Sequence, residues 1–211
     1  MRRPLIAREG WGIIGLLAGL TLLAGWLQPW LAAVPGVLLA LSLWFFRDPE
    51  RRAEASPRDV LAPADGRVLW VREVEEPRYL GGKAIAVSIF LSIFDVHVNR
   101  APVAGRVGYK EYVPGKFRAA WAEGLEEVNE RAYLGIEGPD YRVLVVQIAG
   151  LVARRIRTWV EVGDYLSQGQ RFGMILFGSC TQVYLPLGAT VTVRPGDRVV
   201  AGRTIIGRLP E

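Results

Sequence analysis

Hydrophobic and polar residues are separated along the chain into an apolar N-terminal region and a mixed remainder. Residues 10–46 include no charged residue and no histidine, and the residues that follow carry nearly all of the charge. The apolar region contains two hydrophobic segments, 11–27 and 30–46. A helix rises about 1.5 Å per residue, so each segment lies at the short end of the length that crosses a bilayer. The pattern predicts a membrane-associated helical hairpin over residues 1–46.

The residues at the ends of these segments indicate how the hairpin would meet a membrane. Basic residues on both flanks favour a hairpin whose two ends are cytoplasmic, and tryptophans at the segment ends favour the lipid–water interface. A shallow or re-entrant hairpin in one leaflet is the alternative to two full spans. A cleaved signal peptide fits poorly, because the apolar stretch is too long. We therefore expect a cell-membrane protein whose second domain faces the cytoplasm and an anionic leaflet. The residues concerned are Trp11, Trp26, Trp30 and Trp44, with Arg2, Arg3 and Arg8 before the hairpin and Arg47, Arg51 and Arg52 after it.

Beyond a polar linker, 47–58, the pattern changes to short β-rich runs separated by glycine and other turn residues. One stretch, Phe117–Arg131, has a weak helical pattern that Gly124 interrupts. We expect a mainly β (α+β) fold in which residues 59–211 form a domain that resembles a β-sandwich or barrel. The candidate strands are Val68–Val74, Ala84–Leu91, Arg142–Ile148, Arg157–Val162, Gln182–Leu185, Thr190–Val193 and Thr204–Leu209.

A short repeat occurs twice in the C-terminal part of the chain. Val-Gly-Asp-Tyr-Leu at 162–166 is echoed by Pro-Gly-Asp-Arg-Val at 195–199, and glycines follow each copy. A Gly-Asp turn before a short apolar strand is how a small β domain reverses its chain. Biotinyl and lipoyl carrier domains resemble this pattern, but they present a lysine that neither copy has. The repeat therefore indicates architecture and not a carrier site.

Composition excludes several classes of protein. The high apolar content and the net charge of only +5 exclude disorder. A single cysteine, Cys180, excludes a disulfide framework, and a single histidine, His97, argues against a multi-histidine zinc site. No Walker or Rossmann glycine pattern is found. We expect neither a metal ion nor a nucleic acid as a partner.

Three places could carry chemistry. Asp65-Gly66 precedes a β run and by itself indicates a turn. His97 follows a very apolar run; a lone histidine is usually a core residue, yet it is also the side chain best suited to proton transfer near neutral pH. Gly178-Ser179 in a β-rich region is, taken alone, a common turn.

Together, these three places resemble the phosphatidylserine decarboxylases, specifically the short, membrane-anchored bacterial type. The resemblance covers nearly the whole chain, and the order and spacing of its motifs make it specific. The motifs are Phe-Phe-Arg-Asp-Pro at 45–49, Pro-Ala-Asp-Gly-Arg at 63–67, Phe-Leu-Ser-Ile-Phe-Asp-Val-His-Val-Asn-Arg at 90–100, Asn-Glu-Arg at 129–131, Gln-Ile-Ala-Gly-Leu-Val-Ala-Arg-Arg-Ile at 147–156, and Arg-Phe-Gly-Met-Ile at 171–175 leading into Phe-Gly-Ser at 177–179.

The resemblance implies a self-cleaving enzyme. The Ser179 hydroxyl would attack the Gly178 carbonyl, and elimination would leave chains 1–178 and 179–211 with a pyruvoyl group derived from Ser179. The pyruvoyl ketone would then act as an electron sink for the decarboxylation of phosphatidylserine to phosphatidylethanolamine, without a dissociable cofactor. The two cleavage chains would remain together as a heterodimer, and the apolar hairpin could support further self-association.

The resemblance also implies roles for individual residues. His97 would be the base, because a serine hydroxyl needs one to become a nucleophile. Asp65 is the family's carboxylate partner for this histidine, and Asp95 is a local competitor. Arg154, Arg155 and Arg157 are candidates for the lipid phosphate, with a solvated basic strand edge as the alternative.

Two positions depart from the family pattern. Larger members have a second histidine three residues after the first, and this chain has Arg100 there. One histidine must therefore serve both self-cleavage and decarboxylation, or another donor takes part. Cys180 directly follows Ser179, where it is either a competing nucleophile or a small buried residue.

Three other functions fit the same residues. The substrate could be another seryl lipid, such as an archaeal ether lipid. The chain could be a membrane-anchored binding module that never cleaves itself, which predicts one intact chain. It could also be a soluble enzyme with an incidental apolar tail, which predicts full activity on bilayer substrate without residues 1–46.

Overall fold

The computed structural model describes residues 5–115, 129–150, 155–176 and 179–210, with the side chain of residue 179 excepted. The chain divides into two compact units, Met1–Glu50 and Arg51–Glu211. The division lies within the segment predicted as the linker, 47–58. The expectation of a mainly β fold with an N-terminal helical pair is confirmed.

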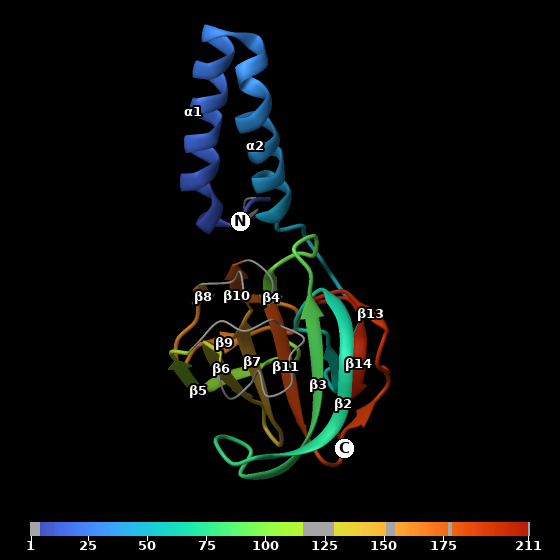
Figure 1. Ribbon diagram of the computed structural model, residues 1–211. Helices are drawn as coiled ribbons and strands as arrows, with labels where there is room; N and C mark the ends of the chain where they lie inside the picture. Colours follow the sequence, from blue (N-terminus) through green and yellow to red (C-terminus); the bar gives the residue numbers. More distant parts are fainter. Residues whose placement is uncertain (1–4, 116–128, 151–154, 177–178, 211) are drawn as a thin grey trace. The chain divides into compact units, whose positions relative to one another are not determined.

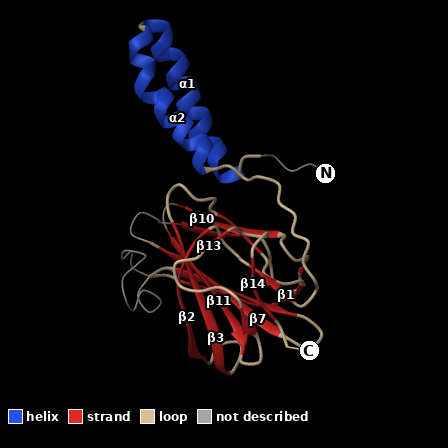
Figure 2. Ribbon diagram, turned by 90° about the vertical axis from the view of Figure 1, so that its right-hand side faces the viewer, coloured by secondary structure: helices blue, strands red, loops and turns tan. Residues whose placement is uncertain are grey.

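The first unit is a helical hairpin. Helix α1, Trp11–Leu27, follows the short 3-10 helix η1, Arg8–Gly10, and helix α2, Ala33–Phe45, follows η2, Pro29–Ala32. Figure 1 and Figure 2 show α1 and α2 side by side. The residues before α1 contact the residues after α2: the Ala7 amide donates to the Phe46 carbonyl at 2.8 Å.

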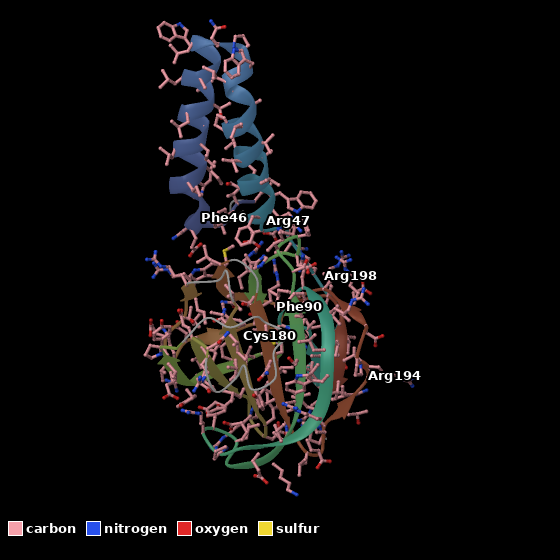
Figure 3. The ribbon with its side chains drawn as sticks, in the orientation of Figure 1. Phe46, Arg47, Phe90, Cys180, Arg194 and Arg198 are labelled. Carbon is pink, nitrogen blue, oxygen red and sulfur yellow. The ribbon has the colours of Figure 1, made fainter. Side chains whose placement is uncertain are left out.

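The surface of the hairpin is almost entirely apolar. Large side chains such as Leu22, Trp26, Trp30 and Val34 are exposed along both helices. The segment Arg8–Leu27 is long and apolar enough to cross a membrane, and Pro29–Phe45 is a shorter apolar helix. At the base of α2, the Arg47 guanidinium lies 4.1 Å from the centre of the Trp44 ring, a pair suited to the lipid–water interface. Figure 3 labels Arg47.

The second unit is built of antiparallel strands (Figure 2). Turn-forming glycines separate them, as the alternation of β-rich runs and glycines predicts. The strands are β1 Asp59–Leu61, β2 Gly66–Glu76, β3 Gly82–Leu91, β4 Val98–Arg100, β5 Gly105–Val113, β6 Arg131–Glu137, β7 Arg142–Ala149, β8 Arg155–Thr158, β9 Tyr165–Leu166, β10 Arg171–Leu176, β11 Ser179–Pro186, β12 Thr190–Val191, β13 Arg198–Val199 and β14 Ile205–Arg208.

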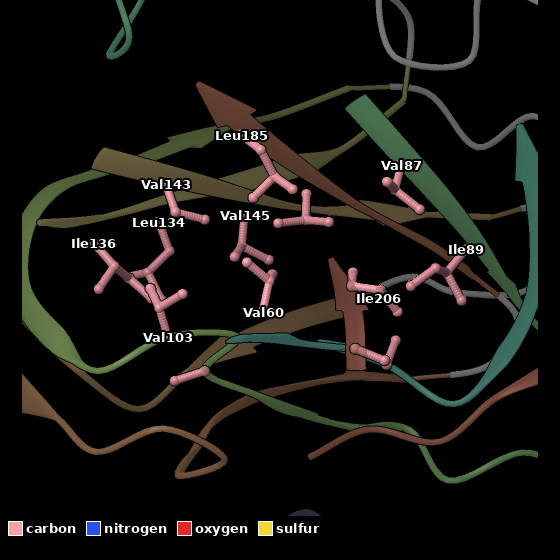
Figure 4. Packing of buried hydrophobic residues seen from close by; sticks show 14 of the residues in the cluster. Val60, Val87, Ile89, Val103, Leu134, Ile136, Val143, Val145, Leu185 and Ile206 are labelled. Carbon is pink, nitrogen blue, oxygen red and sulfur yellow. The ribbon is translucent and has the colours of Figure 1, made fainter. Parts of the chain in front are cut away.

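Eight strands form one curled sheet in the order β13-β2-β3-β11-β7-β6-β5-β9, and two three-stranded sheets, β1-β14-β12 and β4-β10-β8, complete the unit. The main core lies between them: Val87 and Val145 of the large sheet pack in one cluster with Val60 and Ile206 of a small one (Figure 4). Burying one such side chain contributes about 1.5–3 kcal/mol. This core holds the ends of β3, β7 and β11 in fixed register.

Each predicted strand overlaps an observed one, but the predicted ranges leave out strands β1, β4, β5, β6, β9, β10 and β13. Of Arg157–Val162 only the first two residues are in a strand, β8, and residues 159–162 leave it toward the Gly163 turn. The predicted helix Phe117–Arg131 lies mostly outside the described residues, and its last residue begins β6. Strand β5 was missed because its polar residues, such as Lys110 and Glu111, hide the β pattern.

Each copy of the sequence repeat forms backbone hydrogen bonds with one of two similar corners of the β unit. In the first corner, residues 63–68, the Val68 amide donates to the Asp197 carbonyl and the Gly196 amide returns a bond to Val68. In the second corner, residues 102–107, Val107 makes the same pair of bonds with Asp164 and Gly163. We call these the Asp65 corner and the Ala104 corner, after the residue that precedes the glycine in each.

Candidate functional site

Ser179 is the first residue of β11, in the middle of the large sheet. It pairs with Leu91, the last residue of β3, and with Ala149, the last residue of β7. Because both neighbours run antiparallel to β11, the loops that leave β3 and β7 start beside Ser179. We call this the Ser179 end of the sheet, and other motif residues lie there.

His97 reaches the Ser179 end through the chain that follows β3. Its carbonyl accepts a hydrogen bond from the Ile175 amide at 3.2 Å, and Ile175 lies near the end of β10, the strand that leads to residue 179. Strand β4, which follows His97, pairs with the same strand β10. The structure therefore brings the one histidine and the predicted cleavage step to one end of the fold.

The imidazole of His97 is fully buried and has a defined orientation. Its Nδ1 lies 2.9 Å from the main-chain carbonyl oxygen of Asp95. A carbonyl oxygen only accepts hydrogen bonds, so Nδ1 carries the proton in the neutral ring, and Nε2 then carries the lone pair. A neutral imidazole held in this tautomer is suited to act as a base through Nε2.

The Asp95 carboxylate does not contact the imidazole among the described contacts. One oxygen accepts hydrogen bonds from the Ser92 amide at 2.9 Å and the Ser92 hydroxyl at 2.8 Å, and the other lies 3.2 Å from the Arg198 guanidinium. Asp95 therefore orients His97 through its main chain, while its side chain closes the turn before the histidine.

Asp65 lies at the same end of the sheet but has another partner. Its carboxylate forms a two-point ion pair with Arg51, with one contact at 2.7 Å, and accepts a hydrogen bond from the Ala201 amide at 2.8 Å. Both side chains are largely buried. Within the described ranges, Asp65 makes no hydrogen bond with His97, so its predicted role on the histidine remains a prediction.

A chain of buried side-chain amides joins the elements of the site, and the sequence analysis missed it. Gln147 donates to the Asn99 side-chain oxygen at 2.7 Å, and Asn99 donates to the Thr181 hydroxyl at 3.2 Å. Asn99 also contacts the Pro63 carbonyl at 3.3 Å, beside the Asp65 corner. The chain thus links β7, β4 and β11. Its members on these strands lie two residues from Ala149, His97 and Ser179, respectively. Polar residues inside otherwise apolar strands were the sequence signal that could have predicted this buried hydrogen-bonded chain.

The other predicted site residues have mixed placements. Gly178 and Arg154 lie outside the described residues. Arg155 is exposed and pairs with Leu176, near the cleavage step, and Arg157 is exposed further along β8, beside a cavity of about 190 Å³.

The two positions that depart from the family pattern are both buried. Arg100 donates to the Gly169 carbonyl at 3.2 Å, a structural contact between turns. Cys180 packs with Val146 and Ile148, next to Phe90 of β3 and 3.0 Å from the Ser88 hydroxyl (Figure 3).

The described residues were also searched for a metal site and for a cavity that could hold the chemistry. Among them, no three histidine, cysteine, aspartate or glutamate side chains gather as metal ligands would. A cavity of about 590 Å³ lies near Pro186 and Arg142, at the far ends of β11 and β7 from Ser179. It contains none of the motif residues, and we do not place the chemistry there.

Comparison with known proteins agrees with the motifs. The chain matches the model of the phosphatidylserine decarboxylase family over residues 38–207. It is 62% identical to the phosphatidylserine decarboxylase proenzyme of Symbiobacterium thermophilum, covering 100% of this chain and 99% of that protein. The proenzymes of Carboxydothermus hydrogenoformans and Nitrosomonas europaea are 48% and 47% identical, over 99% and 96% of this chain and 99% and 94% of those proteins. This chain belongs to the phosphatidylserine decarboxylase family.

Proposed function

We propose that this protein decarboxylates phosphatidylserine to phosphatidylethanolamine and carbon dioxide after cutting its own chain between Gly178 and Ser179. The observation that carries the proposal is that a chain similar over its full length to the family's proenzymes has His97 and Ser179 at one end of one sheet. The substrate lipid, the cleavage position and the catalytic residues are all parts of this proposal.

Self-cleavage needs only groups that the chain supplies. The Ser179 hydroxyl loses its proton to His97 Nε2 and attacks the Gly178 carbonyl carbon, so that the C–N bond breaks and an ester forms. Removal of the α-proton then breaks the bond between Cβ and the ester oxygen, which releases Gly178 as a carboxylate. Water replaces the remaining nitrogen, which leaves as ammonia, and a pyruvoyl group blocks the new N-terminus at residue 179.

The fold supports a cofactor that remains part of the protein. A pyruvoyl group supplies a ketone that reacts with the lipid amine and accepts the electrons that the departing carboxylate leaves. His97 would hold or return a proton beside it, since the Asp95 carbonyl fixes its ring. The buried amide chain through Asn99 would keep β11 in place while residue 179 changes its chemistry.

The two cleavage chains would stay together. Strand β11 belongs to the short chain 179–211, and it forms ladders with β3 and β7 of the long chain. Strands β13 and β14 of the short chain pair with β2 and β1. Backbone hydrogen bonds and a shared core therefore oppose dissociation after the peptide bond breaks.

Asp65 and three arginines are assigned roles that depend on their charges. We assign Asp65 as the family's catalytic carboxylate, which the Arg51 guanidinium holds in its charged form. Arg154, Arg155 and Arg157 are proposed to bind the lipid phosphate, which a guanidinium matches in geometry.

The apolar hairpin is proposed to hold the protein in the cell membrane, because its exposed surface is mostly hydrocarbon. The basic residues on both flanks of the hairpin support placing the β unit in the cytoplasm.

Intact mass spectrometry of the purified protein tests the proposal. We expect two chains, 1–178 and 179–211, with the smaller one carrying a carbonyl that reacts with hydroxylamine or borohydride. Ser179→Ala should leave one chain and release no carbon dioxide. One intact chain with normal turnover would refute self-cleavage, and turnover of an archaeal seryl ether lipid in preference to phosphatidylserine would change the substrate.

A further inference from the structure

The turn between β3 and His97 exposes apolar residues beside the site. Ile93 and Phe94 are adjacent in this turn, Ser92–Asp95, and they are 52% and 65% exposed. The turn has a defined shape, since the Asp95 carboxylate accepts two hydrogen bonds from Ser92 and the Asp95 amide donates to the Ser92 carbonyl at 3.0 Å. The two exposed side chains are therefore held at the tip of a closed turn.

The position of this turn relates it to the chemistry. It directly follows Leu91, the backbone partner of Ser179, and its last residue orients His97 through its carbonyl. A surface that contacts the Ser92–Asp95 turn would therefore lie against the Ser179 end of the sheet. A lipid whose headgroup must reach residue 179 would enter from this side.

The neighbouring surface has the charge that suits an anionic bilayer. Arg198 is exposed and bonds to Asp95 at 3.2 Å, and Arg67 lies opposite it in the ladder of β2 and β13. Arg194 is exposed at the start of the turn before β13, and the carboxylate Asp197 follows it (Figure 3). Three arginines against the two carboxylates of Asp95 and Asp197 leave this edge with a net positive charge, next to the apolar tip.

We propose that the Ser92–Asp95 turn inserts Ile93 and Phe94 into the lipid–water interface and docks the Ser179 end of the β unit on the bilayer. This contact is separate from the hairpin, and it deepens the proposed function, on which it rests for its purpose. Aromatic and aliphatic side chains enter the interface while arginines meet anionic headgroups. The substrate amine could then reach residue 179 without the lipid leaving the membrane.

A fluorescent probe on the turn tests the docking without any turnover. The full chain with Phe94→Cys, labelled with an environment-sensitive dye, is reconstituted in vesicles of equimolar phosphatidylcholine and phosphatidylglycerol. Cys180 is buried, so the unsubstituted chain measures background labelling. The matched control is Tyr165→Cys, because Tyr165 is 69% exposed and its partner Arg106 pairs with Glu137, at the far end of the sheet from Ser179.

The probe at position 94 should shift to the blue, and nitroxides on the lipid chains should quench it. The probe at position 165 should show neither effect. Replacing phosphatidylglycerol with phosphatidylcholine should weaken quenching at position 94. Equal quenching at the two positions, or none at position 94, would overturn the proposal.

Activity provides a second, independent test. The variant Ile93→Ser/Phe94→Ser should lose about tenfold or more of its turnover on phosphatidylserine in vesicles, since a factor of ten corresponds to about 1.4 kcal/mol of lost interaction. Its turnover of a short-chain phosphatidylserine, assayed below the critical micelle concentration of that lipid, should stay close to that of the unsubstituted chain. The control Tyr165→Ser/Leu187→Ser, also exposed at the far end, should leave both rates unchanged.

Equal loss on both substrates would overturn docking, because it would show a defect in the site itself. If the unsubstituted chain released no carbon dioxide from either lipid, the proposed function would fail, whereas the quenching result would still decide whether the turn enters the bilayer.

Discussion

The Asp65 corner and the Ala104 corner are built alike, and they differ in one buried charge. Arg67 donates to the Gly196 carbonyl at 2.8 Å in the first, and Arg106 donates to the Gly163 carbonyl at 3.2 Å in the second. Each corner also accepts a hydrogen bond from the residues just before the other: the Arg100 amide donates to the Pro63 carbonyl, and the Leu61 amide donates to the Pro102 carbonyl, both at 2.9 Å.

The difference between the corners separates architecture from chemistry. Ala104 occupies the position of Asp65 in a corner with the same backbone bonds, so a carboxylate is not needed to form the turn. Asp65 is nevertheless buried and requires Arg51 as a partner. Burying a charge is costly unless it is paired, so its presence in only one corner supports a role beyond folding.

Asp65→Ala makes the first corner like the second, and we expect the largest effect from it. Arg51 loses its partner in a buried position, which should cost about 3 kcal/mol of unfolding free energy. Self-cleavage should slow by roughly 10²-fold or more, as expected when a group that assists proton transfer is lost. Denaturant unfolding of the detergent-solubilised chain and the fraction of cleaved protein measure the two effects.

The double variant Arg51→Met/Asp65→Ala sharpens this comparison. Removing both charges should restore most of the stability, because an apolar pair can replace a buried ion pair. Self-cleavage should remain slow. A double variant that is stable and cleaves at the normal rate would show that Asp65 serves only the fold.

Gly66→Ala and Gly105→Ala compare the two corners by shape. Both glycines have positive φ, and an added Cβ would lie 1.9 Å from the Phe90 carbonyl oxygen at Gly66 but 2.5 Å from the Glu137 oxygen at Gly105. Each clash is with backbone, so we expect a loss of about 2–3 kcal/mol, larger at Gly66. Equal unfolding midpoints would contradict this order.

Asn99→Leu breaks the amide chain that reaches the first corner through Pro63. It leaves the Gln147 amide without its partner at 2.7 Å, and an unsatisfied buried polar group costs about 1–3 kcal/mol. Gln147→Leu should cost a similar amount, and the double variant should cost less than the sum of the two. Strict additivity in a double-mutant cycle, measured by denaturant unfolding, would show that the two amides act independently.

The smallest effect is expected at Glu111, on β5 beyond the Ala104 corner. Hydrogen bonding from Tyr109, together with the nearby Arg78, holds the pKa of Glu111 below its ordinary value of 4.5, although partial burial opposes this. A lowered pKa means that the unfolded chain binds the proton first. The resulting stability is present above pH 4.5 and is lost as the pH falls below it.

Glu111→Gln should therefore flatten the acidic side of the stability profile slightly and leave neutral self-cleavage unchanged. Thermal unfolding across the acidic range measures it. A steeper profile in the variant would reverse the assigned sign.

Some elements were predictable because their residues have one dominant pattern. Strand β3 consists mostly of small and branched apolar residues, and the run 10–46 contains no charged residue. Strand β5 was not predictable in this way, because charged residues and tyrosines are mixed there with glycine and valine. Its extended conformation depends on pairing with β6. The residues 159–162 are apolar yet leave the strand, because the Gly163 turn redirects them.

The sequence by itself determined the division of the chain into an apolar hairpin and a β unit, the repeated Gly-Asp turns, and the motifs that identify the family. These are local properties, since hydrophobic period and turn chemistry act over a few residues. Only the tertiary structure decided the partners of the charged and polar groups. Gln147 of β7 and Thr181 of β11 meet Asn99 of β4, because backbone pairing between distant strands determines which side chains come within hydrogen-bond distance.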